Sequence, residues 1–296
     1  MVEVTRHIFS SVAFSTLAAT LVACGASLGE YKKFADAGLK YTDAIDALLV
    51  SSASIYVEAG SERLLRNELQ QPDEDLKTYN CTTEREKKWL LLIGRMREHA
   101  DLLKRYFLAL QELANSDSPV QARNTAESIF SQLSTIGATI GSSPLVLSSD
   151  KVKELAAIPE LIISEQIKGG LRAELQARKA AIYKELLLQE LVLQLLQAQI
   201  VADLRDIQSG RDDRLALRPY VSPEPIGNPD GWIQKRQAIR LLSVTSDSLG
   251  SATKASKQFK EAFELLLEDK FSLARANDLM SSINLLLKAV MTLKQS

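Results

Sequence analysis

Apolar residues recur every three or four positions over most of the chain, which is the spacing of one face of an α-helix. A long regular run lies between residues 89 and 113, and another lies between 279 and 293. The first comprises Trp89, Leu92, Met96, His99, Leu103, Tyr106, Leu110 and Leu113. The second comprises Leu279, Ile283, Leu286, Val290 and Leu293. Such runs predict long helices that pack through heptad seams, as coiled coils do.

The segment from Leu171 to about Ile207 is apolar on nearly every face. Leucine or valine occupies eight of the positions from 186 to 196. A helix that is apolar all round is buried all round, so this segment is predicted to be the central helix of a bundle. Glu185, Glu190 and Asp203 disfavour a membrane span, because they would lie in lipid.

Proline and capping residues predict where the first helices begin and end. Pro72 follows Gln70-Gln71 and predicts the end of the first helix, since the residue before a proline favours extended geometry. Thr83 and Glu86 have capping-box spacing and predict the start of the second helix. Ser118-Pro119 predicts the start of the third helix.

The later boundaries follow from the same signals. Gly141–Pro144 predicts the end of the third helix, Asp150 a further start, and Pro159 and Gly169-Gly170 breaks after it. Four prolines between Leu217 and Trp232 predict one long irregular loop over about 209–231. Its aromatic residues, Tyr220 and Trp232, either hold the loop to the body or meet a partner. A helix from near Asp230 and a turn near Asp269 complete the pattern.

Small residues cluster on the first helix, at Ser51–Ser54 and Ala59–Ser61. Small side chains let another helix approach closely, and we expect a helix contact there. No stretch alternates long enough between apolar and polar residues to predict a strand. The predicted fold is therefore all-α: an elongated antiparallel bundle of about six helices with coiled-coil-like seams.

The N-terminus has a different pattern. An uncharged run begins at Ile8 and reaches Leu21-Val22-Ala23-Cys24, with small residues on both sides of the cysteine. A short polar start, an apolar core and small residues before a break are the parts of a secretory signal. Leu-Val-Ala-Cys resembles the lipobox of bacterial lipoproteins, although Glu3 departs from the usual positive start. In that class the peptide is cut before the cysteine, whose thiol carries diacylglycerol and whose amino group is acylated.

The resemblance implies that Cys24 is the lipidation site. It divides the chain into a signal peptide over 1–23, a lipidated tether over 24–30 and a helical bundle over 31–296. It also implies a partner, the lipid bilayer held through acylated Cys24, and a place on the periplasmic side of a bacterial envelope. In enterobacteria-like lipoproteins, an Asp directly after the lipidated cysteine favours retention in the inner membrane. Gly25 occupies that position here, so the resemblance favours the outer membrane. Two alternatives stay open: an uncleaved transmembrane helix over the uncharged run, or an ordinary signal with an incidental cysteine.

Composition narrows the functional classes. The formal net charge is −1, and removing 1–23 leaves it unchanged because Glu3 and Arg6 both go. The near-neutral chain has no overall electrostatic field that would attract nucleic acid, and its sequence has no basic patch with interleaved aromatic residues. With Cys24 lipidated, Cys81 is the only remaining cysteine, so neither an internal disulfide nor a thiolate metal cluster is expected. We interpret Cys81 as a bystander at a helix start.

His99 is the one histidine after Cys24. Because no partner constellation is visible in the sequence, it is interpreted as a hydrogen-bonded seam residue rather than a ligand or an acid/base group. No phosphate loop, nucleophile elbow or metal-binding motif is found, so catalytic, cofactor and metal residues are predicted to be none.

The favoured function is a non-enzymatic envelope lipoprotein that scaffolds or binds a protein partner. The alternative is a binder of an apolar or small ligand within the bundle. An enzyme of unidentified type comes third.

Overall fold

The computed structural model describes residues 28–66, 72–115, 119–143, 171–247 and 250–295. These residues form helices joined by short turns, without a strand in any of the five segments. The helices are α1 (Leu28–Arg66), α2 (Pro72–Asn115), α3 (Pro119–Gly141), α5 (Leu171–Ala177), α6 (Lys179–Arg211), the π-helix η1 (Asp212–Leu217), α7 (Arg218–Val221), α8 (Pro229–Asp247), α9 (Gly250–Leu267) and α10 (Leu273–Gln295). The all-α prediction is confirmed.

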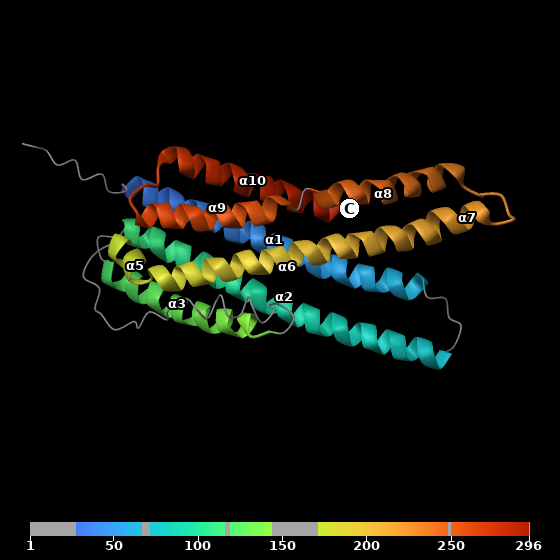
Figure 1. Cartoon of the computed structure of the whole chain (residues 1–296), viewed down its shortest axis with the longest axis horizontal. Helices are drawn as coiled ribbons and strands as arrows, with labels where there is room; N and C mark the ends of the chain where they lie inside the picture. Colours follow the sequence, from blue (N-terminus) through green and yellow to red (C-terminus); the bar gives the residue numbers. More distant parts are fainter. Residues whose placement is uncertain (1–27, 67–71, 116–118, 144–170, 248–249, 296) are drawn as a thin grey trace, which may run out of the picture.

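The helices lie along one axis and make an elongated antiparallel bundle (Figure 1). Helix α1 packs against α2, α6 and α10, and α6 packs against α1, α8 and α9. Helix α3 packs mainly on α2. On the opposite side of α1 and α6, the covering layer changes along the bundle from α9 and α10 to α8 (Figure 1). Helix α6 is in contact with both ends of this layer, and it shares the centre of the bundle with α1. The segment predicted to be one central helix over Leu171 to about Ile207 is two helices, α5 and α6, divided at Arg178.

The predicted seams form the core. Every apolar residue of the run from Trp89 to Leu113 is buried, as is every residue of the run from Leu279 to Leu293. Aromatic rings join three helices at one end: Phe34 of α1 lies 5.0 Å from Phe259 of α9 and 6.0 Å from Phe107 of α2, between ring centroids. Tyr41 stacks on Phe259 at 4.8 Å. One continuous apolar cluster therefore extends through the bundle.

Several predicted boundaries are confirmed. Helix α1 ends at Arg66, ahead of Pro72, and Pro119 and Gly141 bound α3. The turn near Asp269 is present. The Lys270 N–H donates to the carbonyl of Leu265 at 2.8 Å, and Asp269 has a φ of 58°. This is a Schellman ending, with an aspartate where glycine is usual.

The starts of the first two helices differ from the prediction. Helix α1 begins at Leu28, inside the segment expected to be tether. Helix α2 begins at Pro72 rather than at Thr83, so the capping-box pair lies within a helix and Cys81 is an exposed residue of its third turn. Pro72 opens the helix because the first helical position needs no N–H donor. The start predicted at Asp150 and the breaks at Pro159 and Gly169-Gly170 lie outside the described residues.

The long loop predicted over 209–231 is wrong. Helix continues from α6 through η1 and α7 to Val221, and only 222–228 are non-helical. Pro219 has no N–H for the carbonyl four residues before it and would crowd that carbonyl in an α-helix. The chain widens instead into η1, where the Arg218 N–H reaches the carbonyl of Asp213, five residues back. The proline is thus accommodated by a π-helix rather than by a break.

The next helix also differs in its start. Its N-terminal cap is Asn228, whose Oδ1 accepts a hydrogen bond from the Gly231 N–H at 2.9 Å, rather than Asp230. The described part of the predicted single helix is α8, which ends at Asp247, and α9, which begins at Gly250.

Candidate functional site

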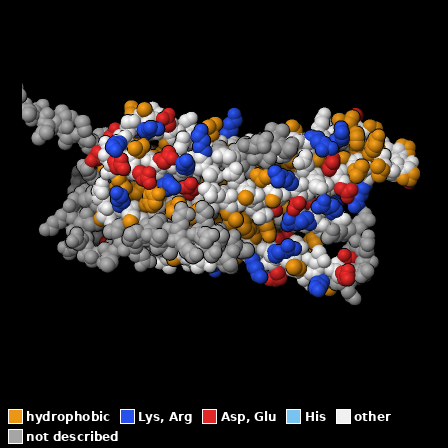
Figure 2. All heavy atoms as spheres, in the orientation of Figure 1, with side chains coloured by type: hydrophobic (Ala, Val, Ile, Leu, Met, Phe, Trp, Pro, Cys, Tyr) orange, Lys and Arg blue, Asp and Glu red, His pale blue; other side chains and the backbone are white. Residues whose placement is uncertain are grey.

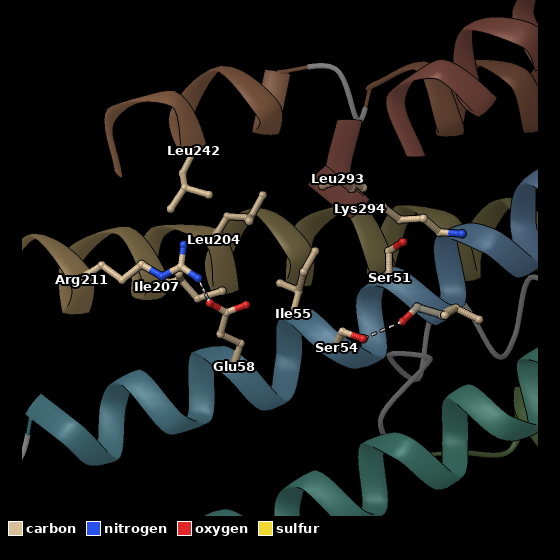
Figure 3. A pocket seen from close by; sticks show the side chains of 11 residues that line it. Ser51, Ser54, Ile55, Glu58, Leu204, Ile207, Arg211, Leu242, Leu293 and Lys294 are labelled. Carbon is tan, nitrogen blue, oxygen red and sulfur yellow. Dashed lines mark hydrogen bonds and ion pairs between the residues drawn. The ribbon is translucent and has the colours of Figure 1, made fainter. Parts of the chain in front are cut away.

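A pocket of about 420 Å³ lies where the covering layer changes from α8 to α10 (Figure 3). This volume falls within the ~300–1,000 Å³ typical of small-molecule sites. Four helices line it. The lining residues are Val50, Ser51, Ser54, Ile55 and Glu58 of α1, Leu204, Ile207 and Arg211 of α6, Leu242 of α8, and Leu293 and Lys294 of α10. The pocket thus lies between the α1–α6 pair and the adjoining ends of α8 and α10.

The pocket has an apolar middle and charged ends. Figure 3 shows Arg211 and Glu58 near one end and Lys294 near the other, with Ile55, Leu204 and Ile207 between them. Arg211 is paired with Glu58 and lies 3.8 Å from Glu62. Glu62 is also bound by Arg214, at 2.7 Å. The Arg211 end is therefore internally neutralised.

The small-residue patch of α1 contributes to this pocket. Ser51 and Ser54 face it, and each hydroxyl donates to a carbonyl of α1 itself, at 3.0 and 3.4 Å. Ser52 and Ala59 are fully buried. The patch thus serves two purposes: part of it meets neighbouring helices, as the sequence predicts, and part leaves the space that forms the pocket.

His99 lies in a second, closed polar site between α2 and α6. Its side chain is 1% exposed. Gln189 Nε2 donates to His99 Nδ1 at 2.6 Å, and His99 Nε2 donates to Glu185 Oε2 at 2.8 Å. Gly137 of α3 faces the Glu185 carboxylate so closely that a Cβ there would collide with it. The interpretation of His99 as a hydrogen-bonded seam residue is confirmed.

The partners of His99 were not predicted from the sequence. Glu185 and Gln189 are four residues apart and share a face of the most apolar helix. A polar pair at that spacing in a buried helix has to be hydrogen-bonded to something, because an unpaired buried polar group is costly. That requirement was the available signal. A second buried pair, Glu174 with Arg178, lies just before α6, and the Arg178 guanidinium is 5.4 Å from the Phe130 ring centroid.

Asp203 is a buried acid on α6. Gln199 donates to its Oδ1 at 2.9 Å, and Arg63 lies 3.9 Å away, while Oδ2 has no hydrogen-bond partner. Burial raises the pKa of Asp203 to about 6, and the Gln199 hydrogen bond and Arg63 only partly offset this. Among the described residues, no group of three or more His, Cys, Asp and Glu side chains is arranged to hold a metal ion.

A third feature is exposed. Leu217, Tyr220, Val221 and Ile233 lie around the turn from α7 to α8, and we call these four residues the distal tip. All four are exposed, Tyr220 by 69% and Val221 by 65%. Hydrophobic side chains gather at this end of the molecule in Figure 2. It is the end farthest from the start of α1 (Figure 1).

The two aromatic residues of this turn have different roles. Trp232 Nε1 donates to the carbonyl of Ala216 at 3.0 Å, so Trp232 holds the turn to the end of the helix before it. Tyr220 stacks on Trp232, with 6.1 Å between ring centroids, but leaves most of its surface in solvent. The distal tip is therefore a fixed surface that exposes apolar side chains.

One described helical run, Lys179–Val221, is long and apolar enough by composition to cross a membrane. Its most apolar window has a mean hydropathy of 1.2, and 56% of that window is buried inside the bundle. The central helix of a bundle meets the same criteria, so the run is weak evidence for a membrane span. Cys24 lies outside the described residues.

No protein-family model, curated protein or solved structure matches this chain.

Proposed function

We propose that this chain is a lipid-anchored envelope protein, without an enzymatic role, that binds a protein partner through the distal tip. The observation that carries the proposal is the exposed apolar cluster at the end of the bundle away from Leu28. Lys179–Val221 is a run of 43 residues, which spans about 65 Å as helix. A bundle tethered near Leu28 would hold the distal tip roughly that far from the tether.

The distal tip has the composition of an interaction surface. Contiguous exposed apolar side chains mark binding sites more often than chance surface, and aromatic residues are enriched in protein interfaces. Tyr220 and Val221 stand on a helix fixed by Trp232, so little conformational entropy would be lost when a partner covers them.

Charged groups of both signs beside the distal tip favour a protein partner, which can leave them in water, over insertion into a bilayer. Glu224 lies in the turn, and Asp230, Lys235 and Arg236 lie in the first turns of α8; all four are exposed. Insertion into a bilayer would take these charged groups toward hydrocarbon, at a cost in free energy. A protein partner with an apolar patch and polar rim leaves them in water.

Site-specific photo-crosslinking of the full chain in its native envelope tests this proposal. A photoactivatable residue at Tyr220 is expected to give one discrete protein adduct. The same residue at Leu273, which is exposed at the opposite end of the bundle, is the matched control and is expected to give none. Val221→Asp should abolish the Tyr220 adduct while leaving the melting temperature unchanged, because exposed substitutions usually alter stability by less than ~0.5 kcal/mol.

Crosslinking of Tyr220 to lipid alone would contradict the proposal, and so would an adduct that survives Val221→Asp. A Tyr220 adduct with a second copy of this chain would show that the partner is another copy of the same protein rather than a different protein.

A further inference from the structure

From the pocket between α1, α6, α8 and α10, we infer a second binding site, for a single-chain amphipathic anion: one hydrocarbon chain with one anionic head group. The inference is independent of the distal tip, which lies at the far end of α6. It rests on the shape of the pocket, its apolar middle and the distribution of charge at its two ends.

The middle of the pocket suits a hydrocarbon chain. Ile55, Leu204 and Ile207 line it from below in Figure 3, and Leu242 and Leu293 line it from above. The serine hydroxyls that face it already donate hydrogen bonds to carbonyls of α1, so they do not need a hydrogen-bond acceptor from a ligand. An apolar chain here would remove these side chains from water at ~25 cal/mol per Å² of buried apolar surface.

The ends of the pocket favour an anionic head group beside Lys294. At the Arg211 end, Glu58 and Glu62 balance Arg211 and Arg214. At the other end, Lys294 is the charged lining residue, and no carboxylate lies among the lining residues beside it. A head group there gains an opposite charge, whereas at the Arg211 end it would compete with two carboxylates. A ligand of this class therefore lies with its head at Lys294 and its chain toward Arg211.

The chain-length dependence follows from this geometry. Each CH₂ buried contributes ~0.8 kcal/mol, which is about a fourfold gain in affinity. Saturated carboxylates of increasing length should therefore bind about fourfold more tightly per added CH₂ until the pocket is filled, and then no more tightly. Because Lys294 is exposed, its charge should contribute no more than about a fivefold preference for the carboxylate over the alcohol of equal length.

The test uses the full chain in phosphatidylcholine nanodiscs and a photoactivatable hexadecanoate. After irradiation, mass spectrometry should place the label on peptides containing Leu204, Ile207 or Leu242. Unlabelled hexadecanoate should compete, hexadecanol should compete about fivefold less well, and acetate should not compete. Competition by a single-chain anionic phospholipid as well as by hexadecanoate would identify a membrane lipid as a source of the same chemistry and support the inference.

Two variants separate the pocket from adventitious labelling. Ser54→Trp places a large side chain in the pocket from an exposed position, and it should abolish labelling with the melting temperature retained. Lys294→Gln should weaken labelling by up to about fivefold, whereas Lys288→Gln, an exposed lysine one and a half turns earlier on α10 that does not line the pocket, should not. Labelling that persists in Ser54→Trp would overturn the inference. Equal competition by hexadecanol would overturn its anionic part.

Discussion

At the scale of single residues, the interior of this bundle contains polar groups that depend on partners from other helices. The contact of His99 with Glu185 joins α2 to α6 where neither side chain reaches water. Gly137 on α3 leaves the room that the Glu185 carboxylate occupies. Three helices thus meet at one hydrogen-bonded contact, whose loss would leave a buried carboxylate without its partner.

His99→Leu should be strongly destabilising, by about 3–5 kcal/mol, because it leaves Glu185 buried without its histidine. The double variant His99→Leu/Glu185→Met replaces both partners with apolar groups and should be more stable than His99→Leu alone. Urea unfolding of the soluble chain beginning at Gly25 measures both. Glu98→Leu, on the exposed face of α2, is the control and should change little. A double variant less stable than the single one would show that the contact does not behave as a buried pair.

The raised pKa of Asp203 predicts that the stability of the fold depends on pH. Its pKa is raised from 3.8 to about 6 in the folded chain, so the folded state binds more protons than the unfolded state between these values. Its contribution to stability is therefore fully present below pH ~4 and is lost as the pH rises through about 6. Asp203→Asn should flatten the melting temperature across this window. Asp206→Asn, whose carboxylate is more exposed, should not, and an equal response of the two variants would contradict the assignment.

At the scale of elements, seams and helix identity could be predicted from the sequence, whereas several boundaries could not. Leu279 to Leu293 are buried at each predicted position because helical spacing alone places them on one face. The capping-box spacing at Thr83 misled because Pro72 starts the helix earlier. Pro219 misled because a π-helix absorbs it. Local sequence signals indicate where a helix could begin or break. The packing of α6, α8 and α1 determines which of these possibilities the structure adopts.

Two glycines in long helices test the packing of α1 on α2. A Cβ on Gly38 would lie 2.6 Å from ring atoms of the buried Phe107, so the helices would have to separate. Gly94 of α2 is exposed, and a Cβ there would meet nothing within 4 Å. Gly38→Ala should therefore lower stability, although alanine favours helix. Gly94→Ala should raise stability by about 1 kcal/mol.

Melting temperatures of the two variants provide the measurement, with each glycine serving as the control for the other. A rise in both variants would mean that α1 and α2 lie farther apart than the structure has them.

At the scale of the whole molecule, the antiparallel architecture was predictable, but the pocket and the distal tip were not. The pocket lies between the α1–α6 pair and the adjoining ends of α8 and α10, an arrangement that no periodicity in the sequence expresses. The residues of the distal tip were expected to lie in or beside an irregular loop, but they lie on η1, α7 and α8, on both sides of a short turn over 222–228. The composition around Tyr220 and Trp232 did point to this region as a surface of interest.

The proposed lipid anchor would determine how the whole molecule is used, since it would set where the bundle is held and which end faces outward. Acylation with two or three chains would hold the protein far more firmly than the marginal binding of a single chain. Without the anchor, the distal tip has no defined distance from a membrane, and the proposal that it is held at a set distance from the tether no longer applies.

Metabolic labelling with a fatty acid, combined with membrane fractionation of the full chain and its Cys24→Ser variant, tests this central claim most directly. The chain with Cys24 should carry the label and fractionate with the membrane. Cys24→Ser should carry none and accumulate as precursor or soluble protein. Label that persists on Cys24→Ser would contradict the anchor, and with it the proposal that this bundle is a tethered envelope lipoprotein.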